Sequence, residues 1–170
     1  DKISNNWIAP FVMASINTKI VRRSNALSNF KYGKDFLYSE ATLCGKGYFG
    51  KIKAYLISFP LLILTLAKPG TFLKKILDWI LPKPGQGPNK KNRETGFFNF
   101  RFYIETNEGD NKIATVTGDM DPGYGSTSKM LAECAVCLAK DNLDELGGVL
   151  TPSVAMGDFL LERLQNFAGI

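Results

Sequence analysis

The chain has 170 residues, of which 45% are hydrophobic and 22% are charged. These are globular values, and the length suits one domain with a buried core. The absence of histidine excludes Ser-His-Asp and Cys-His catalytic sets, histidine-ligated zinc and a histidine pH switch. Three cysteines cannot form a complete disulfide framework, so we expect a reducing, intracellular location. The chain starts without methionine or a secretory leader, and we expect it to be part of a longer protein.

The net charge of +5 hides a strong asymmetry between the two halves. Residues 1–93 contain sixteen Lys and Arg against four Asp and Glu, whereas residues 94–170 contain five against twelve. A basic half favours an anionic partner, such as a phosphate-bearing cofactor or an anionic membrane. The basic residues are scattered and match no zinc-finger, RRM or homeodomain pattern, so we expect no nucleic-acid partner. Alternatively, the two halves face each other, or the rest of the protein is acidic.

The first segment predicts a helix over residues 5–26, because its apolar residues fall near helical spacing. Asn5 or Asn6 can cap its start, and Pro10 would lie in the first turn, where a missing N–H costs little. Next, the roughly alternating aromatic and apolar residues at 32–40 predict a strand.

Arg22, Arg23 and Asn25 lie together at the end of this predicted helix. Cations there complement the helix dipole, which is a purely structural interpretation. Twin arginines could equally hold a phosphate or a carboxylate.

A long apolar stretch follows three glycines. Residues 54–67 carry no charge, but at 14 residues they are shorter than the roughly 20 needed to span a bilayer. Pro60 would kink a helix there. Residues 72–81 are amphipathic and include Trp79, as is typical of interfacial helices. The two segments therefore predict either a buried helical hairpin, in a core or at a homodimer interface, or contact with a lipid or membrane surface.

The second half predicts an antiparallel hairpin and two helices. Residues 97–106 alternate strictly, with four apolar side chains on one face, and residues 112–118 form the return strand. A helix follows, capped by Ser126 or Thr127, and a last helix begins at Thr151. The predicted class is α+β: a mixed sheet that contains antiparallel strands, helices packed on one side, and an apolar helical segment. We expect the hairpin to form the core of the fold and the last helix to keep an uncovered apolar stripe.

The turn Gly-Tyr-Gly-Ser-Thr at 123–127 is a candidate anion site. Free backbone N–H groups, the Ser126 hydroxyl and the helix dipole would converge there, although the spacing differs from that of a phosphate loop. Tyr124 and Lys129 could form a proton-transfer pair, because a lysine lowers the pKa of a nearby phenol. Alternatively, the turn is a plain cap, with the tyrosine packed and the lysine solvated.

Cys134 and Cys137 have the spacing of a redox pair, but they lie well inside the predicted helix and on its apolar face. We therefore interpret them as buried structural cysteines. No metal-ligating cluster stands out, and we expect no Gly-x-Gly-x-x-Gly directly after a predicted strand. This part of the protein alone therefore predicts no dinucleotide-binding fold.

Three blocks of sequence resemble the saccharopine dehydrogenase-like oxidoreductases, a group that includes the trans-acting enoyl reductases of lipid synthesis. The blocks cover nearly the whole chain in order: Trp7–Asn17 with Val21–Leu27; Leu81–Pro88 with Arg93–Phe97; and Asp121–Met130 with Gly147–Pro152, Ala155–Asp158 and Glu162–Leu164.

The resemblance implies a two-domain parent in which an N-terminal Rossmann domain binds NAD or NADP. Residues 1–170 would be the C-terminal domain, which shapes the substrate site or the dimer. Arg22, Arg23, Asn25 and Ser126 would then lie near the cofactor, and Tyr124 and Lys129 near the chemistry. A lipid-like substrate or peripheral membrane association follows from the same resemblance.

Overall fold

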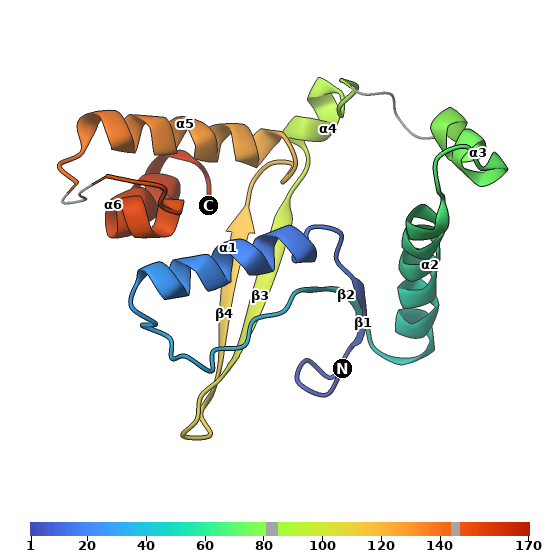
Figure 1. Cartoon of the computed structure of the whole chain (residues 1–170), viewed down its shortest axis with the longest axis horizontal. Coiled ribbons are helices and arrows are strands. Elements are labelled where there is room, and N and C mark those ends of the chain that lie inside the picture. The colour runs from blue at the N-terminus through green and yellow to red at the C-terminus, as the bar shows by residue number, and fades with distance from the viewer. Residues whose placement is uncertain (81–84, 144–146) are drawn as a thin grey trace. The chain divides into compact units, whose positions relative to one another are not determined.

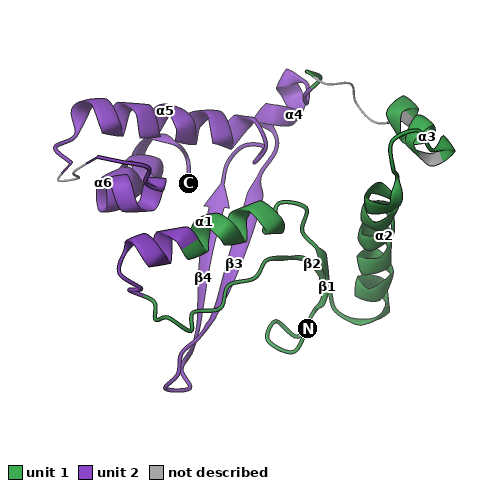
Figure 2. Cartoon of the chain, in the orientation of Figure 1, with its two compact units in different colours: residues 1–22, 32–86 green, residues 23–31, 87–170 purple. Residues whose placement is uncertain are grey.

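The computed structural model describes residues 1–80, 85–143 and 147–170. These residues form six helices and four strands (Figure 1). The elements in chain order are β1 Trp7–Pro10, α1 Ala14–Leu27, β2 Ala41–Gly45, α2 Gly47–Leu66, α3 Phe72–Ile80, α4 Lys90–Glu94, β3 Phe98–Glu105, β4 Asn111–Gly118, α5 Gly125–Lys140 and α6 Pro152–Phe167. The chain divides into two compact units, residues 1–22 with 32–86 and residues 23–31 with 87–170 (Figure 2).

The first unit is built on a small antiparallel sheet. Strand β1 pairs with β2, and the first turns of α2 pack on this pair. Ala9, Cys44 and Ala54 form the buried cluster, one from each element. Gly50 allows the close approach, because a Cβ at this position would collide with the Gly45 carbonyl.

Two predictions for this unit are wrong. The helix predicted from Asn5 begins only at Ala14, because Trp7–Pro10 pairs with Ala41–Gly45 as a strand. Trp and Ile favour extended backbone when a partner strand is available, and that partner is remote in sequence. The strand predicted at 32–40 is irregular, and the strand lies at Ala41–Gly45 instead.

The aromatic pattern that suggested the earlier strand instead reflects ring contacts. The Tyr32 and Phe36 centroids lie 5.4 Å apart, and those of Phe36 and Tyr38 lie 6.4 Å apart. Aromatic pairs at such separations stabilise a local arrangement without a sheet ladder.

Helix α2 is longer than the uncharged run alone predicts. It extends over 20 residues and continues through Pro60. By length and composition it is apolar enough to cross a membrane, which corrects the expectation drawn from the 14-residue run. Gly50 and Ala54 are its buried residues, so within the described residues the two apolar segments do not form a buried hairpin. Leu81, the last residue of the predicted segment, lies outside the described residues.

The second unit contains the predicted hairpin. Strands β3 and β4 pair antiparallel from Phe98 opposite Gly118 to Glu105 opposite Asn111, which confirms the prediction to within about one residue. In the described residues, however, this is a separate two-stranded sheet, and there is no mixed sheet with helices on one side. Every residue of β4 except Gly118 is exposed, so the hairpin is not the core.

The core of the second unit lies between α5 and α6. Cys137, Met156 and Leu160 are buried there. As predicted, Thr151 and Pro152 occupy the cap and first position of α6. Other apolar side chains of these two helices are exposed: Leu131 and Leu138 on α5, and Phe159 on α6. Among the described residues of α6, Phe159, Leu161 and Phe167 are exposed, but they do not follow helical spacing, so the uncovered apolar stripe stays a prediction.

Candidate functional site

The candidate site is a shallow hollow of about 160 Å³ in the second unit, at the start of α5. Drug-sized ligands usually occupy roughly 300–1,000 Å³, so this hollow alone is too small for a dinucleotide. A phenol, two cations, a carboxylate and a hydroxyl reach its walls, which are formed by Lys90, Arg93, Glu94, Met120, Tyr124, Gly125 and Ser128.

Glycines bring two distant segments together at this hollow. The Asp121 N–H donates to the Arg93 carbonyl at 3.0 Å. A Cβ at Gly96 would lie 2.6 Å from the Asp121 Cα, and a Cβ at Gly125 would lie 3.0 Å from the Arg93 carbonyl oxygen. Side chains larger than hydrogen would push the two segments apart. The second and third resemblance blocks therefore meet in space.

Asp121 caps helix α5. Its Oδ2 accepts the N–H of Tyr124 at 2.7 Å and that of Gly125 at 3.4 Å. The prediction that Ser126 or Thr127 caps the helix is wrong, because their hydroxyls donate instead to the carbonyls of Met120 and Pro122. A carboxylate of the chain itself thus occupies the amides that a bound anion would need, which favours the plain-cap interpretation of the turn.

The predicted catalytic pair is not brought together. Lys129 donates through Nζ to the Asp119 carboxylate at 3.0 Å and 3.2 Å. Tyr124 is 55% exposed at the hollow, and its ring lies against Gly87, where a Cβ would be 3.2 Å from Cζ. Lys129 therefore has Asp119 as its hydrogen-bond partner, and proton transfer by Tyr124 and Lys129 stays a prediction.

Three of the four cofactor-binding candidates, Arg23, Asn25 and Ser126, lie in the second unit. Arg22 is exposed. Arg23 donates from Nη2 to the Val149 carbonyl at 2.7 Å. Asn25 is buried, and Ser126 is fully buried with its hydroxyl bonded to the Met120 carbonyl. Arg23, Asn25 and Ser126 are therefore part of the packing of the second unit.

Sequence reasoning missed Ser24. Its Oγ lies 2.8 Å from Thr151 Oγ1 and 3.2 Å from Ser153 Oγ. Together with the Arg23 contact, these bonds tie the end of α1 to the loop before α6. Arg23-Ser24 belongs to the first block of resemblance and Thr151-Pro152 to the third, but nothing in the sequence indicates that these two segments are in contact.

The CxxC cysteines are positioned as structural residues. Cys137 is fully buried, and Cys134 is half-buried. Burial raises the pKa of both thiols, and a hydrogen bond with Asp141 raises that of Cys137 further. A raised pKa keeps the thiols protonated and unreactive. Across the described residues, no group of three His, Cys, Asp or Glu could hold a metal ion.

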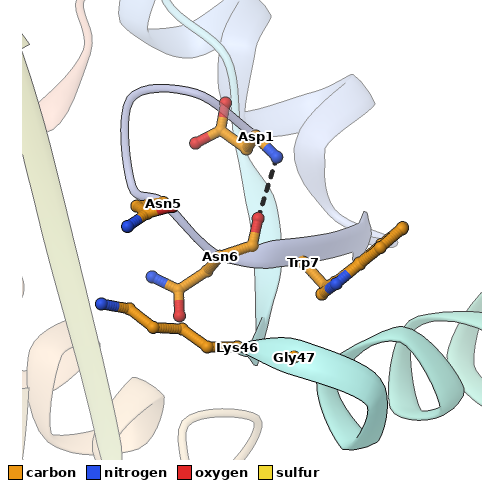
Figure 3. Close-up of a pocket in the computed structure, with 6 residues that line it drawn as sticks. All are labelled: Asp1, Asn5, Asn6, Trp7, Lys46 and Gly47. Atoms are coloured by element: carbon orange, nitrogen blue, oxygen red, sulfur yellow. Dashed lines mark hydrogen bonds between the residues drawn. The ribbon is translucent and has the colours of Figure 1, made fainter.

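A second hollow lies in the first unit (Figure 3). It is lined by Asp1, Asn5, Asn6, Trp7, Lys46 and Gly47. The Asp1 amino group donates to the Asn6 carbonyl at 2.8 Å, and the Lys51 ammonium lies 5.7 Å from the Trp7 ring centroid. The amides of Asn5 and Asn6, the Lys46 ammonium and the charged groups of Asp1 favour polar contacts, but this hollow shares no residue with the predicted sites.

Known proteins resemble this chain along nearly its whole length. It is 38% identical over 168 residues to a trans-acting enoyl reductase of Mycobacterium ulcerans, and 38% identical over 175 residues to those of Mycobacterium bovis and Mycobacterium tuberculosis. This chain is homologous to the trans-acting enoyl reductases. Another homologue from Mycobacterium tuberculosis, also 38% identical, is named provisionally as a trans-acting enoyl reductase. No protein-family model matches the chain, and no solved structure matches it significantly.

The match confirms the resemblance and defines its extent. The alignments cover 96% to 99% of this chain but only 40% to 41% of the enoyl reductases. The chain thus spans about two fifths of the length of these relatives. Within the second unit, parts of all three blocks that carried the resemblance are in contact, through Arg23 with Val149 and through Arg93 with Asp121.

Proposed function

We propose that residues 1–170 are the C-terminal domain of an NAD(P)-dependent enoyl reductase, and that they shape its substrate side. The observation that supports this most directly is the 38% identity to trans-acting enoyl reductases across 96% of the chain and 40% of the relative. A Rossmann domain in the remaining part of the parent protein would bind the nucleotide.

One feature supports this division of labour. Gly45, Gly47 and Gly50 do have the Gly-x-Gly-x-x-Gly spacing between β2 and α2, so the prediction that no such spacing follows a strand is wrong, but β2 pairs antiparallel with β1 and does not open a βαβ unit. In the described part of the chain, both sheets are antiparallel pairs, whereas dinucleotide-binding domains use parallel strands. Homology to enoyl reductases implies a nicotinamide cofactor in general, and that cofactor would supply the hydride for an alkene reduction.

The hollow at α5 would supply the proton and the charge stabilisation that the reaction needs besides the hydride. Reducing an alkene conjugated to a carbonyl requires a proton donor and stabilisation of the negative charge that develops on oxygen. Tyr124 offers a phenol at the hollow, and Lys90 and Arg93 offer cations beside it. Ser128 adds a hydroxyl that donates to the Gly125 carbonyl at 2.8 Å. We infer a lipid-like acyl substrate for this surface.

Calorimetry tests the proposal by comparing NADPH binding to this chain and to the full-length parent protein. We expect binding to the parent and a much weaker interaction with residues 1–170. Equal affinity for the two proteins would overturn the proposal, because the nucleotide site would then lie within this chain.

A further inference from the structure

Beyond its first turns, helix α2 has an apolar surface that the chain leaves uncovered. Gly50 and Ala54 are the buried residues of this helix, and no described residue after Ala54 is buried. One stripe, at spacings of three and four residues, is more than half exposed at each position: Tyr55, Phe59, Leu62 and Leu66. A soluble surface rarely leaves a continuous stripe of this kind in water.

The serine and threonine hydroxyls of this helix are bonded within the helix. The Ser58 hydroxyl donates to the Ala54 carbonyl at 2.7 Å, and the Thr65 hydroxyl donates to the Leu62 carbonyl at 2.7 Å. Hydroxyls bonded within their own helix need no water, and Pro60 inside a helix is a feature that lipid-exposed helices tolerate. From Ala54 to Ala67, therefore, Tyr55 is the one residue whose side-chain polar group is not bonded within the helix, and a tyrosine hydroxyl can lie at the level of the lipid headgroups.

Helix α3 adds an amphipathic element to the same unit. Trp79 is 87% exposed and Ile76 is 38% exposed, while Lys74 forms an ion pair with Asp78. Tryptophan prefers the level of lipid headgroups, where its ring is half solvated.

The positive charge beside α2 and α3 indicates an anionic partner for their apolar surface. Lysines stand at both ends of the uncharged run and along α3, at positions 51, 53, 68, 74 and 75, whereas Asp78 is the single acidic residue between 47 and 80. Pairing two copies of this hairpin would bring like charges together, while anionic headgroups would neutralise them.

We propose that α2 and α3 insert into one leaflet of an anionic membrane, with the lysines at the headgroups. Helix α2 has 20 residues and is about 30 Å long, but its first turns pack on the β1–β2 pair and carry Lys51 and Lys53. The uncharged part that remains for insertion, residues 54–67, is about 21 Å long, which is shorter than the roughly 30 Å hydrocarbon core. Lysines at both ends of this part favour a helix that lies along the interface. This inference is independent of the proposed reductase activity.

Vesicle flotation of the full chain tests the insertion. We expect recovery with vesicles of phosphatidylcholine and phosphatidylglycerol, and much less with phosphatidylcholine alone. The double variant Phe59→Asp/Leu62→Asp should abolish flotation. Each charge removed in Lys68→Gln, Lys74→Gln or Lys75→Gln should weaken vesicle binding about fivefold.

The matched control is Leu131→Asp/Leu138→Asp, which alters two equally exposed apolar residues on α5. It should float like the wild type, and circular dichroism should give the same helix content for both double variants. Equal loss in the two double variants would overturn the proposal, as would a lipid-independent dimer in light scattering with no flotation.

Tryptophan fluorescence provides a second readout that needs no disruptive variant. In Trp7→Phe, Trp79 is the remaining tryptophan. Its emission should shift to the blue with anionic vesicles, and lipids brominated at shallow positions should quench it more than lipids brominated near the bilayer centre. An unchanged spectrum would contradict insertion.

Discussion

Arg163 of α6 holds the Asp141 carboxylate in a bidentate grip, with Nε–Oδ2 at 2.6 Å and Nη2–Oδ1 at 2.8 Å. Asp141 follows the last residue of α5, so the pair joins the two helices that form the core of the second unit. A third bond, from Arg163 Nη1 to Glu133 at 3.3 Å, adds a second carboxylate. Paired geometry of this kind makes arginine hard to replace by lysine.

The first prediction concerns acid stability. Hydrogen bonds from Arg163 lower the pKa of Asp141 from 3.8 to about 2. The stabilisation is therefore complete above pH 4, and it is lost as the pH falls through about 2, because the unfolded state takes up the proton first. Thermal melts should give a lower Tm for Asp141→Asn than for the wild type at pH 7, with the gap closing between pH 4 and pH 2. A gap independent of pH would contradict this role.

A second prediction tests the contact that builds the candidate site. Gly96→Ala places a Cβ 2.6 Å from the Asp121 Cα, and such overpacking costs about 1–3 kcal/mol. Urea unfolding should therefore give a lower midpoint. Gly123→Ala is the control, since its nearest atom would be 3.5 Å away and its unfolding should stay close to that of the wild type. Equal midpoints for the two variants would refute the close approach.

Local patterns predicted the parts of the fold that depend on neighbouring residues. The β3–β4 hairpin follows from strict alternation on both sides of a short loop, and the start of α6 follows from Thr151 and Pro152. Strand β1 was missed because its partner, Ala41–Gly45, is remote in sequence, and the apolar spacing before Ala14 also matches a helix. Pairing between distant strands leaves no local signal.

The turn predicted as a candidate site begins a helix, but its contacts differ from those predicted. The turn at Tyr124 does begin a helix, but the Asp121 carboxylate accepts the Tyr124 N–H, and Lys129 donates to the Asp119 carboxylate. An acidic residue three positions before Tyr124 was a visible signal for an Asx-type cap. The approach of Gly96 to Asp121 joins segments that no spacing rule connects.

A third prediction concerns thiol reactivity. Burial raises the pKa of the Cys137 thiol, which is fully inaccessible to solvent. Iodoacetamide should therefore leave Cys137 unmodified in the folded chain and modify it once urea is added, as peptide mass spectrometry would report. A disulfide between Cys134 and Cys137, or rapid alkylation of Cys137 without denaturant, would contradict a structural role.

A fourth prediction tests the Tyr124 phenol in the full-length parent protein, for which we propose an enoyl reductase activity. If Tyr124 donates the proton, Tyr124→Phe should lower kcat by about 10²-fold or more with little change in KM. Thermal unfolding should change little, because the ring that contacts Gly87 is retained. Phe167→Leu is the matched control, since Phe167 is exposed on α6 and does not line the hollow. Unchanged kcat in Tyr124→Phe would remove this residue from the chemistry.

A last prediction follows from Glu40, which accepts the Tyr38 hydroxyl and the Asn17 amide, each at 2.9 Å. Burial first, and then Glu40, raise the pKa of Tyr38 to about 12. This contribution to stability is complete below pH 10 and is lost as the pH rises toward 12, because the unfolded phenol ionises first. Difference absorbance between the wild type and Tyr38→Phe should report one tyrosine titrating near 12. In Glu40→Gln its pKa should fall but stay above 10, since burial persists, and a pKa near 10 in the wild type would contradict the contact.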